Sequence, residues 1–237
     1  MDDPPGEREG CGATGVEIPP ALRPTRVWAQ FSGMNDELPR WSEPRKLTDD
    51  PHVNLFTTEM ATAKGVRRWT FASRRDQPGK NRAVPDAVVM IAVANGRIPK
   101  IVLTREYRVP LGVFEISVPS GLVDPGESIA DAARREFREE TGMALERISL
   151  LSPPLASSAG LTDETVSLVY GEAAGEVSRS GQTEHESIEV ILADLDHLRR
   201  MLAEPGGDVF SSRVYPVLLG FVAAGRIALP FASSAAE

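Results

Sequence analysis

The chain has little of what marks secreted, membrane-bound or nucleic-acid-binding proteins. Its 237 residues include a single cysteine, Cys11, so no disulfide can form within the chain. The spacing of its three histidines, His52, His185 and His197, does not indicate a transition-metal site. We find no secretory signal pattern and no apolar run long enough to span a bilayer, and the net charge of -8 argues against a general nucleic-acid-binding surface. We therefore expect a cytoplasmic protein that binds neither membranes nor nucleic acid.

The size and composition of the chain allow one sizeable core, because 41% of the residues are hydrophobic. Residues 1–45 are rich in proline and glycine, and we expect them to form an arm that is partly disordered. Residues 46–230 are expected to form the functional domain, and residues 231–237 a C-terminal tail. The arm contains Trp28 and Trp41, which could pack across the domain or at a dimer interface, or belong to a loosely docked arm.

A helix is predicted directly after a Pro-Gly turn in the middle of the chain. Ser128 is a suitable N-cap, with the acidic Asp131 three residues later, and Gly142 is a typical stop signal. These signals place the helix from about Ser128 to Thr141. At about 100° per residue, its apolar side chains fill one arc, and three glutamates of its last turns lie within or beside that arc.

These glutamates, Glu136, Glu139 and Glu140, stand where a surface helix would not place them. Three like charges at i, i+3 and i+4 near a helix C-terminus repel one another and oppose the helix dipole. A bound cation would reverse both penalties. Carboxylate oxygens without cysteine or paired histidine suit a hard ion such as Mg²⁺, for which Mn²⁺ can substitute, and both ions bridge phosphate oxygens well. The pattern therefore favours phosphate chemistry in a cleft, and the alternative is an ordinary charged surface helix.

The spacing around these glutamates matches a known motif. Residues 121–143 read Gly-x5-Glu-x7-Arg-Glu-Φ-x-Glu-Glu-x-Gly-Φ, where Φ is an apolar residue. The defined positions are Gly121, Glu127, Arg135, Glu136, Phe137, Glu139, Glu140, Gly142 and Met143. The segment resembles the Nudix box at every defined position, so the chain resembles a Nudix hydrolase. This resemblance implies that Glu136, Glu139 and Glu140 ligate the metal, that the carbonyl of Ser120 adds a ligand, and that Glu127 and Arg135 form a structural pair.

Strand-like runs lie on both sides of the box helix. Apolar or alternating runs bounded by turn residues predict strands at His52–Thr58, Arg67–Ser73, Asp86–Ala94, Ile101–Glu106, Val113–Val118, Ile148–Leu151, Val166–Ala173 and Ile188–Leu192. Further helices are predicted at Asp194–Leu202 and Ser212–Ala224. This order indicates an α/β protein with a mixed sheet flanked by helices. It fits the Nudix fold that the resemblance implies, an α/β/α sandwich whose mixed β-sheet positions the loop-helix-loop of the box, and the resemblance extends from roughly Lys46 to Leu229.

Shorter segments resemble one branch of the family, the ADP-ribose and nucleoside-diphosphate-sugar pyrophosphatases. They are Arg105-Glu106-Tyr107-Arg108, Val118-Pro119-Ser120-Gly121 and Ser158-Ala159-Gly160 with Glu164. In that branch the arginine that matches Arg108 contacts substrate phosphate, which suits the two-point geometry of a guanidinium group; a surface ion pair is the alternative. Glu164 lies in a stretch suited to a mobile loop, and the resemblance makes it a candidate general base or metal ligand; a solvated loop glutamate is the alternative.

Two positions depart from that branch. It usually has Ser-Pro-Gly where this chain has Ser158-Ala159-Gly160, and Glu where this chain has Ser117, with Glu115 two residues earlier on the same strand face. Neither departure affects the metal-binding glutamates. Hydrolysis is therefore better supported than the identity of the substrate.

The resemblance implies metal-dependent hydrolysis of a nucleoside diphosphate linked to another moiety, with ADP-ribose yielding AMP and ribose 5-phosphate as the first hypothesis. Glu164, or a box glutamate such as Glu139 or Glu140 that is not fully engaged by metal, would take a proton from water. Tyr107 or Trp69 could stack on the nucleobase, although each is more often a core residue.

Alternative functions stay open. The substrate could be a GDP-sugar, a dinucleoside polyphosphate or a coenzyme A derivative. The domain could also be a non-catalytic nucleotide sensor, but the intact glutamate set argues against that. The branch commonly forms homodimers, so a homodimer is expected here.

Overall fold

The computed structural model describes residues 41–78, 84–181 and 187–230, all of which belong to one compact unit, residues 37–237. The expected tail, His185 and most of the expected arm, including Trp28, lie outside these residues. Among the described residues, no helix combines the length and the apolar character needed to cross a bilayer.

The larger of two sheets carries the core of the protein. Its strand order is β12-β6-β5-β4-β10-β8, with β11 paired to β5, β7 to β4 and β9 to β10. The strands are β4 (Ala87–Ala94), β5 (Lys100–Arg108), β6 (Val113–Ser117), β7 (Ser120–Leu122), β8 (Ala144–Leu151), β9 (Leu155–Ala156), β10 (Thr165–Ala174), β11 (Glu189–Ala193) and β12 (Val209–Phe210). Strand β4 pairs with β10, and β6 with β12, in parallel, whereas β5 pairs antiparallel with β4, β6 and β11. The sheet is therefore mixed, as the sequence predicts.

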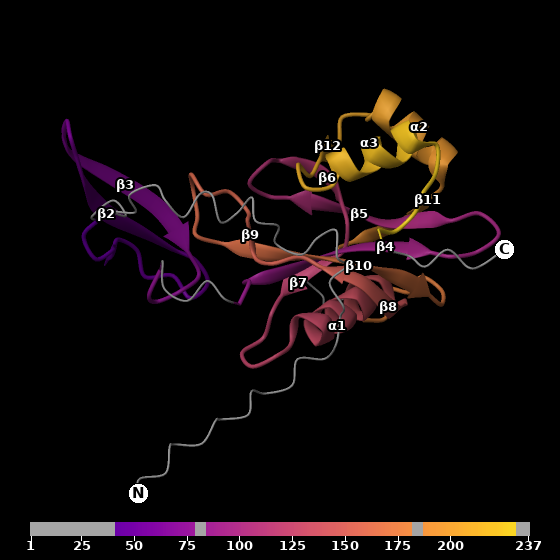
Figure 1. Cartoon of the computed structure of the whole chain (residues 1–237), viewed down its shortest axis with the longest axis horizontal. Helices are drawn as coiled ribbons and strands as arrows, with labels where there is room; N and C mark the ends of the chain where they lie inside the picture. The colour runs from indigo at the N-terminus through magenta and orange to yellow at the C-terminus, as the bar shows by residue number, and fades with distance from the viewer. Residues whose placement is uncertain (1–40, 79–83, 182–186, 231–237) are drawn as a thin grey trace, which may run out of the picture. The chain divides into compact units, whose positions relative to one another are not determined.

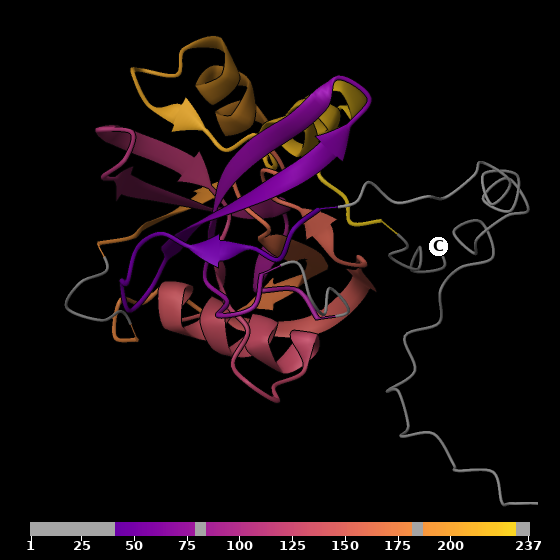
Figure 2. The same ribbon diagram turned by 90° about the vertical axis from the view of Figure 1, so that its left-hand side faces the viewer.

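Helices cover both faces of this sheet. Helix α1 (Ile129–Thr141) lies on one face, and α2 (Leu195–Ala203) and α3 (Tyr215–Ala224) lie on the other (Figures 1 and 2). Strand β4 shows why its sequence is a continuous apolar run. Its alternate side chains pack into two separate cores, one with Phe137 of α1 and the other with residues of α2 and α3. The structure thus has the predicted α/β/α arrangement.

The first strands form a smaller sheet of their own, which corrects the expectation of one sheet. Strands β1 (Arg45–Lys46), β2 (Asn54–Thr62) and β3 (Gly65–Ser73) pair antiparallel in the order β1-β2-β3. The edges of the strand that follows, β4, are already occupied by β5, β7 and β10, so the hairpin pairs with itself. The Ala72 N–H donates to the Leu161 carbonyl at 2.8 Å and links β3 to the loop before β10.

Helix α1 has the boundaries that its local signals predict. The Ser128 side chain accepts a hydrogen bond from the Asp131 N–H, and Gly142 closes the helix in the left-handed region at φ 74°. Helix α3 instead begins three residues later than predicted. The residues before it form a turn in which the Val214 and Tyr215 N–H groups both donate to the Ser211 carbonyl.

Candidate functional site

Two box glutamates lie directly against the backbone of strand β7. The Glu140 side chain is buried, and its Oε2 accepts a hydrogen bond from the Ser120 N–H at 3.0 Å. The Glu136 carboxylate occupies the space in which a Cβ atom at Gly121 would lie. The helix and the strand therefore approach closely enough to fix both carboxylates, and the approach requires glycine at residue 121.

Arg135 connects three glutamates of the box. Its Nε and Nη2 donate to the two carboxylate oxygens of Glu127 at 3.0 and 2.8 Å, the two-point geometry that guanidinium and carboxylate favour. Its Nη1 donates to Glu136 at 2.8 Å and to Glu139 at 3.3 Å. The hydrogen bonds from Arg135 hold the pKa of Glu127 below its ordinary value, and those same bonds raise the pKa of Arg135. The expected structural pair, Glu127 and Arg135, is thus in direct contact.

The chemistry of the glutamate cluster suits a hard divalent ion, although the side chains are turned to protein partners. In the described ranges, no three His, Cys, Asp or Glu side chains converge in a metal-binding arrangement. However, Glu136 and Glu139 both reach the same nitrogen of Arg135, and Glu136 and Glu140 both lie against residues 120–121. The cluster offers only oxygen donors, and Glu139 is the most open of the three at 47% side-chain exposure. These residues fit an oxygen-ligated ion, which would compete with Arg135 for Glu136 and Glu139.

A polar cavity begins where the glutamates meet β7. It is lined by Arg74, Ala87, Val89, Arg108, Glu115, Ser120, Gly121, Leu122, Glu164, Val166 and Arg213. We call it the polar cavity. The candidate phosphate ligand Arg108 lies at the end of β5, where its Nε donates to Glu115 of β6 at 2.8 Å and its Nη1 lies 2.8 Å from Glu106. Glu115 therefore shares the cavity with Arg108 and fixes the direction of the guanidinium group.

Glu164 lies where the polar cavity meets a second cavity. Its Oε1 is 3.7 Å from Nε of Arg74, and its side chain is one-quarter exposed. The Glu164 N–H donates to the Thr162 hydroxyl at 3.1 Å, and the Ser157 N–H donates to the Glu164 carbonyl at 3.1 Å. The loop that carries Glu164 is thus held by its own polar groups, with the carboxylate near a cation.

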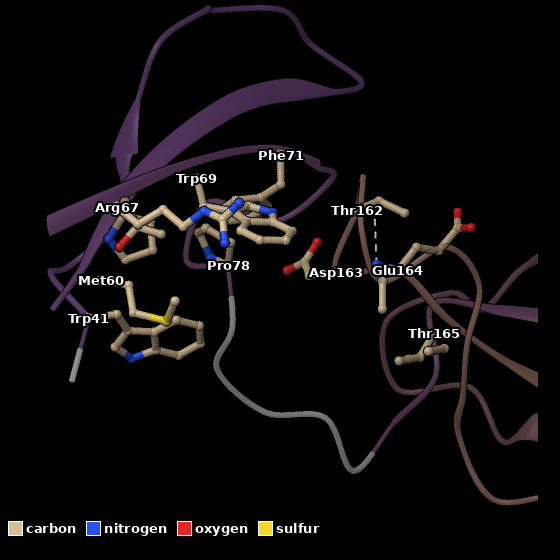
Figure 3. A pocket seen from close by; sticks show the side chains of 14 residues that line it. Trp41, Met60, Arg67, Trp69, Phe71, Pro78, Thr162, Asp163, Glu164 and Thr165 are labelled. Carbon is tan, nitrogen blue, oxygen red and sulfur yellow. Dashed lines mark hydrogen bonds between the residues drawn. The ribbon is translucent and has the colours of Figure 1, made fainter. Parts of the chain in front are cut away.

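The second cavity is mostly apolar. It is lined by Trp41, Pro44, Thr58, Met60, Arg67, Trp69, Phe71, Pro78, Ala156, Ala159 and residues 162–165. We call it the aromatic cavity. Figure 3 shows its two tryptophans near the hairpin of β2 and β3, and the Glu164 carboxylate turned away from Trp69. Trp69 therefore lines a cavity that adjoins the polar one, whereas Tyr107 lies outside both linings and packs edge-on against Phe114 at 5.4 Å.

Two arginines of the polar cavity, Arg74 and Arg213, were not identified from the sequence. Neither belongs to a motif: Arg74 directly follows strand β3, and Arg213 lies between β12 and α3. A basic residue next to a strand or a helix is too common a pattern to single out. Their convergence depends on tertiary structure.

Comparisons with known proteins agree with the box motif. The model of the NUDIX domain family, described as "NUDIX domain", matches residues 84–214. The chain is 30% identical over 131 residues to "Putative nudix hydrolase 2" of Caenorhabditis elegans, covering 53% of this chain and 58% of that protein. It is 32% identical over 106 residues to "ADP-ribose pyrophosphatase" of Saccharomyces cerevisiae, covering 45% of this chain and 46% of that protein. The chain thus spans about half the length of these curated relatives.

A solved structure shares the fold. This structure, "Crystal structure of ADP compounds hydrolase", superimposes with a TM-score of 0.58 at 19% sequence identity. The alignment covers 80% of this chain and 97% of that one. At 19% sequence identity, this similarity shows a shared fold and nothing further.

Proposed function

This chain belongs to the NUDIX domain family, and on that basis we propose that it is a metal-dependent hydrolase of a nucleoside diphosphate linked to another moiety. The observation that carries the proposal is the polar cavity, in which residues 120–121 beside the box glutamates share one space with Glu164 and three arginines. Such a site offers acid ligands for a cation and guanidinium groups for phosphate. The relatives named for ADP-ribose and ADP compounds make ADP-ribose the first substrate to test.

The metal ligands in this proposal are Glu136, Glu139, Glu140 and the carbonyl of Ser120. A divalent ion, which we expect to be Mg²⁺, would supply positive charge to the diphosphate and make a water molecule more acidic. Arg108 would donate to a phosphate oxygen from its place beside Glu115. Because Glu115 and Glu106 already hold its guanidinium group, Arg108 is positioned before the substrate arrives.

Glu164 is the proposed general base, because it lies on the lining of the polar cavity and turns away from the tryptophans. It would accept a proton from the attacking water. The water oxygen bonds to one phosphorus atom, the bridging P–O bond breaks, and the bridging oxygen leaves with the other phosphate. With ADP-ribose the products are AMP and ribose 5-phosphate. Glu139 and Glu140 are the alternative bases within the box.

The aromatic cavity is proposed to take the nucleobase. Trp69 lines it, and this cavity shares Glu164 with the polar one, so a base and a diphosphate joined by a ribose could occupy both. Tyr107, the other aromatic residue considered, lines neither cavity. The homodimer and the cytoplasmic location that the sequence led us to expect belong to this proposal as well.

A second candidate function is a nucleotide sensor without turnover. It is favoured by one observation: Arg135 already donates hydrogen bonds to Glu136 and Glu139. In a binding domain, these protein contacts would take the place of a metal ion at the two carboxylates. Metal-dependent turnover of any substrate excludes this candidate.

A substrate panel tests the proposal. Purified protein is incubated with Mg²⁺ and ADP-ribose, a GDP-sugar, a dinucleoside polyphosphate or a coenzyme A derivative, and products are separated by chromatography, with EDTA as the control. We expect ADP-ribose to be cleaved fastest and EDTA to stop the reaction. Faster cleavage of another compound would replace the substrate, and a panel left intact would favour the sensor.

A further inference from the structure

Arg213 lines the polar cavity from a segment far along the chain from the other residues of the site. It lies between strand β12 and helix α3, after the regions that carry the box and Glu164. No motif in the sequence includes it. Arg213 thus adds a further cation to the cavity that Arg108 and Ser120 also line.

The segment that carries Arg213 is fixed to the strand that carries Glu115. Strand β12 pairs in parallel with β6, with Val209 opposite Glu115, and the Ser211 N–H donates to the Ile116 carbonyl at 2.9 Å. Just before β12, Asp208 accepts two hydrogen bonds from Arg105 of β5, at 2.6 and 3.0 Å. These contacts hold the backbone near Arg213 at the polar cavity, although the Arg213 side chain is exposed.

The three arginines of the polar cavity differ in how their charges are compensated. Arg108 is bound by two glutamates, and Arg74 lies 3.7 Å from Glu164. The guanidinium group of Arg213 has no carboxylate partner within the part of the chain that the structure describes, and its Nη1 donates to the Ser157 hydroxyl at 3.4 Å. An uncompensated guanidinium group beside a diphosphate site is the one whose charge is available to an anion.

We propose that Arg213 is a substrate-binding residue that donates to a phosphate oxygen of the substrate. The inference rests on the proposed function and adds a residue to it. Ser157, which Arg213 contacts, is hydrogen-bonded to Glu164 through the backbone, so Arg213 touches both the substrate and the loop of the proposed base. When Arg213 binds the phosphate, its contact with Ser157 also holds the loop of Glu164 near the substrate.

The test compares Arg213→Gln, Arg213→Lys and a control, Arg226→Gln. Arg226 is an exposed arginine that follows α3 and does not line the polar cavity, so its variant removes the same charge elsewhere. For ADP-ribose hydrolysis, we expect Arg213→Gln to raise KM by roughly 10- to 100-fold with kcat changed by less than about threefold. Arg213→Lys should lie between Arg213→Gln and the wild type, because an ammonium group keeps the charge but not the two-point geometry. A KM for Arg213→Gln equal to that of Arg226→Gln would overturn the inference while hydrolysis stands.

A binding measurement separates this inference from the proposed function. The affinity for inorganic pyrophosphate is measured by calorimetry in EDTA, where no turnover occurs. We expect Arg213→Gln to weaken it at least about tenfold and Arg226→Gln to leave it near the wild-type value. If the wild type cleaves no compound of the substrate panel but this pattern holds, the inference stands and the hydrolase proposal fails. Equal affinities in the two variants, or no pyrophosphate binding by the wild type, overturn the inference. If Arg213→Gln does not fold, Arg213→Lys takes its place in both assays. A wild-type KM for ADP-ribose together with a wild-type affinity for pyrophosphate in Arg213→Lys would overturn the inference.

Discussion

The carboxylate of Glu136 lies over the backbone of Gly121, in the space that a Cβ atom at residue 121 would fill. The backbone of Gly121 is not in the left-handed region, so alanine can adopt it, and the effect of a substitution is steric. Gly121→Ala should displace the Glu136 carboxylate and lower kcat for ADP-ribose by about 100-fold, the cost of misplacing a reacting group by about 1 Å. The measurement is kcat as a function of Mg²⁺ concentration.

Gly96→Ala is the matched control for this change, because the nearest heavy atom to a Cβ there is the Ile98 carbonyl oxygen at 4.0 Å. It should keep wild-type activity. Equal activity of the two alanine variants would show that the position of Glu136 against residue 121 does not matter to the reaction.

Glu127 should make stability depend on pH at the acidic end. Hydrogen bonds from Arg135 hold its pKa below the ordinary value, so its contribution to folding is present above the usual range of a glutamate and is lost as the pH falls through the lowered pKa. Glu127→Gln should therefore be less stable than the wild type at pH 7, and the difference should shrink below about pH 4. Denaturant unfolding at a series of pH values checks this, with the exposed Glu146→Gln as control. A difference that stays constant down to pH 3 would contradict the role of the ion pair.

Glu164 should control proton transfer. Glu164→Gln removes the base and should lower kcat by roughly 10²- to 10⁴-fold with a smaller change in KM. Steady-state kinetics with ADP-ribose measure both parameters. Glu176→Gln, an exposed site that lines neither cavity, is the control. If Glu164→Gln keeps the kcat of this control, the base must be sought among Glu139 and Glu140.

Phe137 should be the main anchor of the box helix. Its side chain is fully buried against Val88 and Met90 of β4, and replacing a buried phenylalanine by alanine costs about 3–5 kcal/mol of unfolding free energy. Urea unfolding of Phe137→Ala should show a loss of this size, and Leu111→Ala, at an exposed site, should show little. A loss below about 1 kcal/mol for Phe137→Ala would mean that the helix is held by other contacts.

Local signals account for what the sequence predicts well. Ser128 and Gly142 define the ends of α1 because each acts on the backbone within a few residues, and both residues cap the helix in the structure. The apolar run of β4 likewise indicates a strand buried on both faces. The separate sheet of β1, β2 and β3 was not predicted, because the pattern of a strand does not show whether its hairpin pairs only with itself or joins the larger sheet.

The sequence predicts the members of the candidate site and the Glu127–Arg135 pair, but not the other contacts of the site. The hydrogen bonds that Arg135 also donates to Glu136 and Glu139 depend on rotamers that spacing does not fix. The position of Arg213 at the cavity depends on the pairing of β12 with β6. Strand β12 has only two residues, which are too few to show an alternating pattern in the sequence. Tertiary pairing therefore decides which basic residues reach the polar cavity.

The most direct test of the account is the release of AMP and ribose 5-phosphate from ADP-ribose with Mg²⁺, by the wild type, Glu140→Gln and the control Glu146→Gln. Glu140 is a proposed metal ligand, so its variant should lose at least about 100-fold in turnover, while Glu146→Gln and the wild type should stay equal and need the metal. Turnover by Glu140→Gln at the wild-type rate, or a wild type that leaves ADP-ribose and every other nucleoside diphosphate derivative intact, would contradict the account.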